Sequence, residues 1–182
     1  MRVLVAITGA SGAIYARQAV EMLIANDSVE AIGIIYSDNA PDVLKAEGVT
    51  MPTSQKIVNI ANDDMWSSAA SGSSRWNAMI IIPASMGTCG RIAAGISRTL
   101  IERAADVMLK QRRRLVVVVR EAPYSLIHLR NMVTLTEAGA VVIPASPSFY
   151  FNPSSIEELC MTITTRAIEM AGISVEHKHW GE

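Results

Sequence analysis

The chain has 182 residues, of which 50% are apolar and 18% charged. It is long enough for one well-packed domain (1–182) and too short for two domains that each have a full hydrophobic core. Its net charge of -1 gives no basic surface of the kind that binds nucleic acid or an anionic membrane, and neither partner is expected. The two cysteines, Cys89 and Cys160, lie far apart without a metal-ligand spacing. They predict no metal site and no disulfide, and they favour a reducing cytoplasm.

The first residues, MRVLVAITGASGA, contain too short an apolar run for a signal peptide or a membrane span, and are expected to form a strand. Further strands are expected at 31–36, 57–60, 78–82, 115–119 and 140–143. Helical spacing is found at 14–25, 40–47, 91–109, 125–138 and 154–171, and the longest irregular stretch, 63–77, is expected to be a mobile loop. The alternation predicts an α/β fold: a doubly wound, mainly parallel, six-stranded sheet with helices on both faces.

Two stretches of small residues follow strands at the edge where a doubly wound sheet binds its ligand. TGASGA, residues 8–13, opens the first helix, where free amides favour a phosphate, although a tight structural turn has the same composition. PASMGT, residues 83–88, repeats the pattern, and Ser37 follows the second strand. These donors predict one shared crevice for a mononucleotide with a flat ring, such as FMN. Met86 is there either a flavin contact or part of the core.

Charged residues mark further candidates. Arg120 and Glu121 follow a run of apolar strand residues directly, at a sheet edge where a charge needs a partner or a ligand. Arg103 and Lys110 are seven residues apart on one helix face, where both could engage a phosphate or simply face solvent. Arg166 lies among apolar neighbours in the last helix, with a structural ion pair and ligand binding both open.

The segment 147–153, PSFYFNP, is a stiff loop that could present the Tyr150 hydroxyl or bury its phenylalanines as an anchor. His128 is expected to pack within an apolar helix, and His177 and His179 to lie in a solvated tail. No serine-histidine-acid order is visible, which favours phosphate chemistry without a metal.

These motifs, together with residues 96–132 (ISRTLIERAADVMLKQRRRLVVVVREAPYSLIHLRNM) and 138–150 (AGAVVIPASPSFY), resemble the UbiX-type flavin prenyltransferases over nearly the whole chain. The resemblance implies a Rossmann-like domain that binds FMN and forms a homododecamer with sites shared between subunits. It also implies transfer of a dimethylallyl group from dimethylallyl phosphate to N5 and C6 of reduced FMN. The product, prenylated FMN, would serve a UbiD-type decarboxylase.

The resemblance also assigns roles to individual residues. The positions expected to bind FMN are Gly9, Ala10, Ser11, Ser37, Ser85, Met86, Gly87, Thr88 and Arg120. The positions expected around the isoprenyl phosphate are Glu47, Arg103, Lys110, Glu121, Tyr150 and Arg166. Among them, Lys110 would stabilise charge on the departing phosphate, while Ser11 and Glu121 would steer protons during ring closure, which makes these three the expected catalytic residues.

The chain departs from the family pattern at two places. Gly87 stands where many relatives have lysine, and Phe151-Asn152 replaces a common His-Arg pair. Both departures lie near the expected ligand, so the chain length and the phosphate form of the donor stay open.

Two alternative functions remain. A flavin-dependent cysteine-type decarboxylase would have asparagine after the PAS turn and a histidine in the first half of the chain, whereas Met86 follows Ser85 here and the first histidine is His128. A non-catalytic FMN-binding subunit of a decarboxylase complex is disfavoured by the presence of the four residues Lys110, Glu121, Tyr150 and Arg166.

Overall fold

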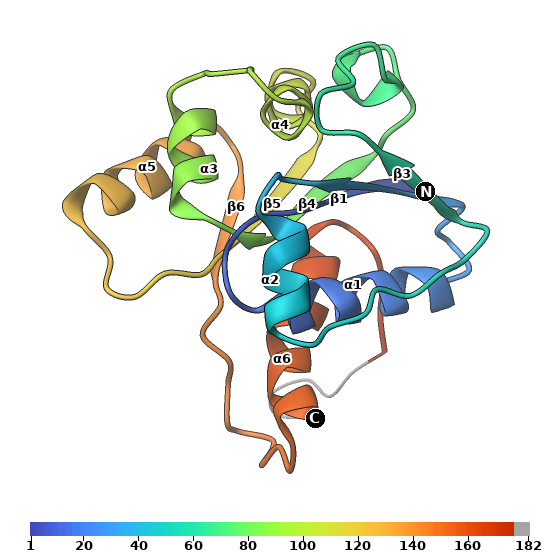
Figure 1. The fold of residues 1–182 in the computed structure, drawn as a ribbon, viewed down its shortest axis with the longest axis vertical. Coiled ribbons are helices and arrows are strands. Elements are labelled where there is room, and N and C mark those ends of the chain that lie inside the picture. The colour runs from blue at the N-terminus through green and yellow to red at the C-terminus, as the bar shows by residue number, and fades with distance from the viewer. Residues whose placement is uncertain (177–182) are drawn as a thin grey trace.

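The computed structural model describes residues 1–176, and its helices are arranged around one six-stranded sheet (Figure 1). The strands are β1 (Arg2–Ile7), β2 (Ala31–Tyr36), β3 (Ile57–Ile60), β4 (Ala78–Ala84), β5 (Arg114–Val119) and β6 (Val141–Pro144). The helices are α1 (Ala13–Ala25), α2 (Ala40–Ala46), the 3-10 helix η1 (Ser68–Ala70), α3 (Met86–Ala93), α4 (Leu100–Lys110), α5 (Leu126–Glu137) and α6 (Ile156–Met170). All strand pairs are parallel, in the order β3-β2-β1-β4-β5-β6. The predicted doubly wound, Rossmann-like α/β fold is confirmed.

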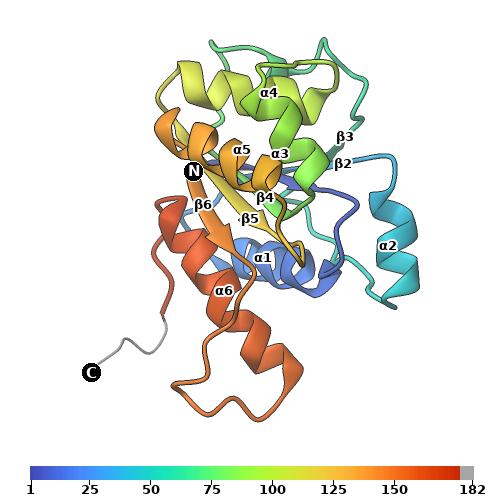
Figure 2. The same ribbon diagram turned by 90° about the vertical axis from the view of Figure 1, so that its left-hand side faces the viewer.

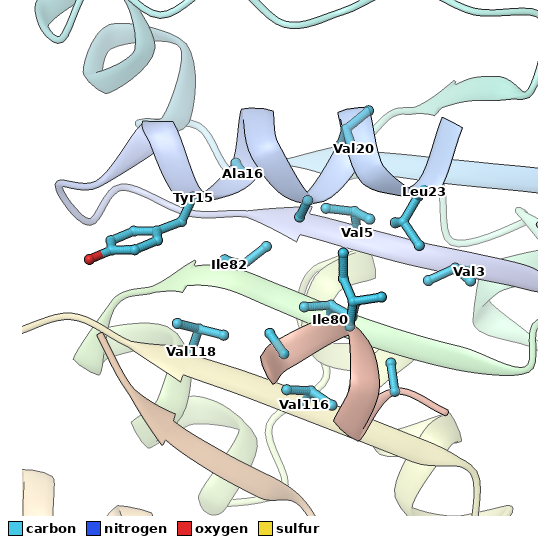
Figure 3. Close-up of a cluster of buried hydrophobic side chains, with 14 of the residues drawn as sticks. Val3, Val5, Tyr15, Ala16, Val20, Leu23, Ile80, Ile82, Val116 and Val118 are labelled. Carbon is cyan, nitrogen blue, oxygen red and sulfur yellow. The ribbon is translucent and has the colours of Figure 1, made fainter. Parts of the chain in front are cut away.

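The central strands are buried on both faces because helices cover both sides of the sheet, which is why their sequences are nearly unbroken apolar runs, rich in valine and isoleucine. On one face, Val5, Ile80 and Val116 pack against α1 and α6 (Figures 2 and 3). The opposite face packs against α3, α4 and α5 through alternate residues such as Leu4 and Ile81. Each fully buried side chain of this size contributes about 1.5–3 kcal/mol of transfer free energy, so this double layer fixes the positions of the strand ends.

The helix predicted at 91–109 is in fact two helices. α3 begins at Met86, before the predicted start, and the chain turns at Gly95, whose φ of 70° lies in the left-handed region that glycine tolerates best. α4 then begins after Thr99, which forms a capping box with Glu102. The break directs the N-termini of both helices toward the carboxyl edge of the sheet, where a single continuous helix could direct only one.

Two other regions show features that the sequence did not reveal. The stretch 63–77 is largely irregular, as expected, but it also contains η1 and buries Trp76, whose indole N–H donates to the Ser68 hydroxyl (3.1 Å). His128 was expected to pack in an apolar helix; instead, its Nδ1 accepts a hydrogen bond from the Ser125 amide and caps α5. His177 and His179 lie outside the described residues. Within 1–176, none of the helices combines the length and hydropathy that crossing a bilayer would require.

Candidate functional site

The site lies where the direction of winding reverses. The chain proceeds outward from β1 to β3 and then returns to the other side of β1 with β4, which opens a crevice at the carboxyl ends of β1 and β4. Thr8, 1% exposed, joins the two ends: its hydroxyl donates to the Pro83 carbonyl (2.7 Å) and accepts from the Ser85 amide (2.8 Å). The two small-residue turns predicted from the sequence are therefore held side by side.

A cavity of about 330 Å³ opens at this edge, within the size range of small-molecule sites. Its walls come from both turns, the starts of α2 and α4, and the segment after β3. The lining residues are Gly9, Ser37, Asp38, Asn39, Asn62, Ser85, Gly87, Thr88, Arg91, Thr99, Ile101 and Glu102. A Cβ atom at Gly9 would lie 2.8 Å from that of Asn39, so only glycine lets the first turn pack this closely against α2.

The N-terminus of α3 faces the cavity. Ser85 is its N-cap, and the Ser85 hydroxyl accepts from the Thr88 amide (3.4 Å) and hydrogen-bonds with the Thr88 hydroxyl (3.1 Å). The Met86 side chain is buried in the core on the α3 side of the sheet, which supports the packing alternative for that residue. The first turn of α3 therefore offers backbone amides and hydroxyls suited to an anion.

The N-terminus of α1 differs from the prediction that its amides are free for a phosphate. Glu47, at the end of α2, accepts hydrogen bonds from the amides of Gly12 (2.9 Å) and Ala13 (2.7 Å). Burial alone would raise the pKa of Glu47, but hydrogen bonds from Ser11 and these amides, with the charge of Arg120, lower its pKa overall. A side-chain carboxylate thus takes the place of an external anion at α1.

Arg120 and Ser11 join Glu47 in a cluster beside the cavity. The Arg120 Nε donates to the Ser11 carbonyl (3.2 Å), which ties the end of β5 to the first turn. Glu121 follows Arg120, and its carboxylate accepts from the Ala122 amide (3.0 Å). The structure therefore brings Ser11, Glu47 and Arg120 together, with Glu121 adjacent in the chain, as a charged cluster at the carboxyl edge.

The cations predicted on α4 do not join this cluster within one chain. Arg103 donates to Asp106 (2.6 Å) and to the Ala70 carbonyl (3.1 Å). Lys110 is exposed at the last position of α4, shortly before β5 begins, and therefore lies at the opposite, amino-terminal edge of the sheet. Arg103 and Lys110 share a helix face, but seven helical residues span about 10 Å. The shared face therefore does not mean that both residues reach one phosphate.

Tyr150 and Arg166 also lie apart from the crevice. Tyr150 is 71% exposed in the loop that projects from the sheet between β6 and α6, and Phe149 and Phe151 beside it are exposed as well, so they do not anchor the loop in the core of this chain (Figure 2). Arg166 is exposed near the end of α6 and donates to Glu169 (3.2 Å), as its structural alternative predicted.

Arg91 and Glu102 are cavity residues that the sequence-based analysis missed. Glu102 is 1% exposed and accepts from the Arg91 Nε and from the amides of Arg98 (2.8 Å) and Thr99 (3.0 Å). Burial raises its pKa, but the hydrogen bonds from Arg91 and these amides lower it more. The pattern Thr99-x-x-Glu102 is a capping-box signature and could have revealed this helix start.

Comparisons with known proteins agree with this description. Doubly wound sheets bind nucleotides in a crevice at this switch point, and the family model described as Flavoprotein matches residues 1–173, which identifies the chain as a flavoprotein. The flavin prenyltransferase UbiX of Methanocaldococcus jannaschii is 38% identical over 100% of this chain and 99% of its own.

A UbiX crystal structure in complex with FMN and dimethylallyl pyrophosphate is 37% identical over 98% of both chains, with a TM-score of 0.88. A dodecameric FMN-dependent UbiX-like decarboxylase from Escherichia coli O157:H7 is 32% identical, covers 100% of both chains and has a TM-score of 0.91. The chain belongs to the UbiX family of flavin prenyltransferases.

Proposed function

We propose that this protein joins a dimethylallyl group from an isoprenyl phosphate to N5 and C6 of reduced FMN, giving prenylated FMN for a UbiD-type decarboxylase. The observation that carries the proposal is the cavity between β1, β2 and β4 with the cluster of Ser11, Glu47 and Arg120 directly beside it. The cavity suits a nucleotide, and the cluster supplies charge and proton-transfer groups where the reacting ring would lie. Two buried thiols, Cys89 and Cys160, support a cytoplasmic location.

The residues at the cavity fit FMN. Ser37, Ser85 and Thr88 provide hydroxyl groups, and the first turn of α3 provides backbone amides for a phosphate. Gly9 and Gly87 leave backbone without side chains at the cavity wall, so the ligand can approach it closely. The buried network through Thr8 holds these groups in place before a ligand arrives, which lowers the cost of binding.

Reduced FMN supplies the nucleophilic ring atoms, and the phosphate of the donor leaves with the bonding electrons of the allylic carbon. Arg120, whose Nε donates to the Ser11 carbonyl, would place a positive charge beside the reacting ring. Closing the second bond would add a proton to one carbon of the allylic double bond and remove one from C6 of the flavin, and the Glu121 carboxylate, two residues after β5, is proposed to take the proton from C6. The Ser11 hydroxyl, bonded to Glu47, can relay it.

The four remaining predicted residues, Arg103, Lys110, Tyr150 and Arg166, are proposed to act on the site of a neighbouring copy. They occupy α4, the 147–153 loop and α6, away from the crevice of their own chain. α5 exposes Leu126, Ile127 and other apolar side chains, which is typical of a surface that another subunit covers. We propose a homododecamer, as described for the relative from Escherichia coli.

Anaerobic incubation with reduced FMN and dimethylallyl phosphate tests the proposal, with the flavin mass as readout. The wild-type protein should increase the mass of FMN by one dimethylallyl unit. Glu121→Gln should still bind FMN but form product about 100- to 10,000-fold more slowly, since the amide keeps the shape and loses the proton-transfer capacity. Parallel reactions with the monophosphate and the diphosphate donor identify the preferred form.

Two results would contradict this assignment. Unmodified flavin from folded, FMN-loaded wild-type protein would favour the non-catalytic FMN-binding subunit. Product formation by Glu121→Gln at the wild-type rate would remove Glu121 from proton transfer.

A further inference from the structure

Arg91 is the cation of the cavity. Of the described residues that line it, only Arg91 carries a positive charge, whereas Asp38 and Glu102 carry negative ones. An FMN phosphate has a charge close to -2 at neutral pH, so a site without a counter-charge would bind it poorly. Arg120 does not line the cavity, and its Nε donates to the Ser11 carbonyl in the cluster with Glu47.

The guanidinium of Arg91 is held in one orientation. Its Nε donates to the buried carboxylate of Glu102, and its Nη2 donates to the Thr88 hydroxyl (3.3 Å). Glu102 is itself fixed by the two amides at the start of α4. With one edge of the guanidinium fixed by Glu102 and Thr88, Nη1 is left to face the start of α3.

Gly87 provides the space for this arrangement. A Cβ atom added at Gly87 would lie 3.3 Å from Arg91 Nη1, tighter than most real Cβ contacts. The guanidinium therefore lies over the first turn of α3, next to the backbone that carries the free amides. Arg91, one turn along the helix, and the helix N-terminus converge on the same volume.

The N-terminus of α1 cannot serve the same anion, because Glu47 already accepts from its amides. A phosphate at α1 would have to displace a carboxylate whose pKa is lowered by that very contact. At the start of α4, Glu102 and Asn62 already accept from the first amides, and the start of α2 carries Asp38, whose negative charge repels a phosphate. The start of α3, with Ser85, Thr88 and Arg91, is therefore the anion site that remains among the described residues at this edge.

We propose that Arg91 binds the phosphate of FMN at the start of α3, and that Glu102 and Gly87 position its guanidinium for this contact. The inference rests on the proposed use of FMN, but it concerns flavin binding and not prenyl transfer.

Equilibrium binding of FMN and of riboflavin, which lacks the phosphate, tests the proposal. Arg91→Met keeps the apolar stem of the side chain and removes the charge, so FMN affinity should fall about 10- to 100-fold, the range expected for a lost charge-assisted hydrogen bond. Riboflavin affinity should stay unchanged, which also shows that the variant is folded. Arg91→Lys, which keeps the charge, should lose less than Arg91→Met.

A transplanted charge gives a second test. Gly87→Lys combined with Arg91→Met places an ammonium over the same turn of α3, and should recover part of the lost preference for FMN over riboflavin; the ratio of the two affinities cancels any loss of access that both ligands share. If Arg91→Met is unstable because Glu102 is left unpaired, Arg91→Met with Glu102→Gln removes the orphan carboxylate, and the same two ligands are compared.

Equal loss of FMN and riboflavin by folded variants, or no loss of either, would show that Arg91 serves only the ion pair with Glu102. If the wild type failed to transfer a prenyl group, this test would still be valid, because the test measures only flavin binding. Failure of the wild type to bind FMN would overturn both.

Discussion

Glu102 shows how one residue links stability to the site. Its carboxylate is buried, caps α4 through two backbone amides and pairs with Arg91 at the cavity. The capping half of this arrangement is encoded locally, by the spacing of Thr99 and Glu102. The ion pair with Arg91 is not encoded locally, since Arg91 lies on a different helix and meets Glu102 only because the chain turns at Gly95.

Glu102→Ala should lower the free energy of unfolding by about 2–3 kcal/mol at pH 7, because a helix cap and a hydrogen-bonded charge pair are lost together. The pKa of Glu102 is lower in the folded than in the unfolded chain, so its ionisation stabilises the fold above its unfolded pKa of about 4.3. This contribution is lost as the pH falls through the folded-state pKa.

The difference between wild type and variant should therefore shrink below about pH 4. Urea denaturation from pH 7 downward measures this, with the exposed Glu137→Ala on α5 as the matched control. A constant difference across the series would show that the charge of Glu102 does not contribute.

At the scale of elements, the strands were the most predictable part. Buried runs such as 115–119 were found within one or two residues of their predicted bounds, because burial on both faces leaves little choice of residue. The division between α3 and α4 was missed, since both helices are apolar on one side and Gly95 alone is a weak signal. α5 satisfies its helical pattern but buries only Leu135 fully, which a single sequence does not reveal.

Val133→Asp on α5 should dissociate the assembly, because it places a charge on an apolar surface that we expect a second copy to cover; Val133 is 56% exposed in one chain. Light scattering coupled to size exclusion would give the mass of the particle. Val58→Asp, the same change at a valine 50% exposed on β3, is the control and should keep the assembly. Unchanged mass for Val133→Asp would show that this face of α5 does not form the interface.

At the scale of the whole molecule, the sequence predicted the position of the crevice. It could not show which of the predicted site residues lie away from the crevice of their own chain. Small-residue turns after adjacent strands mark the edge of the sheet, and Thr8 holds them together as expected of a doubly wound fold. The position of Lys110 depends on the direction in which α4 runs, and its proposed contribution depends on where a neighbouring copy lies. Neither follows from spacing along the chain.

The claim that FMN occupies the cavity between β1, β2 and β4 is tested most directly by titrating the purified protein with FMN. The wild type should saturate at about one FMN per chain. Gly9→Val should weaken binding by about 10- to 100-fold while the protein stays folded by circular dichroism, because its Cβ would lie 2.8 Å from that of Asn39 and push apart the cavity wall. Absence of FMN binding by the folded wild type, or equal affinity in Gly9→Val, would contradict this placement.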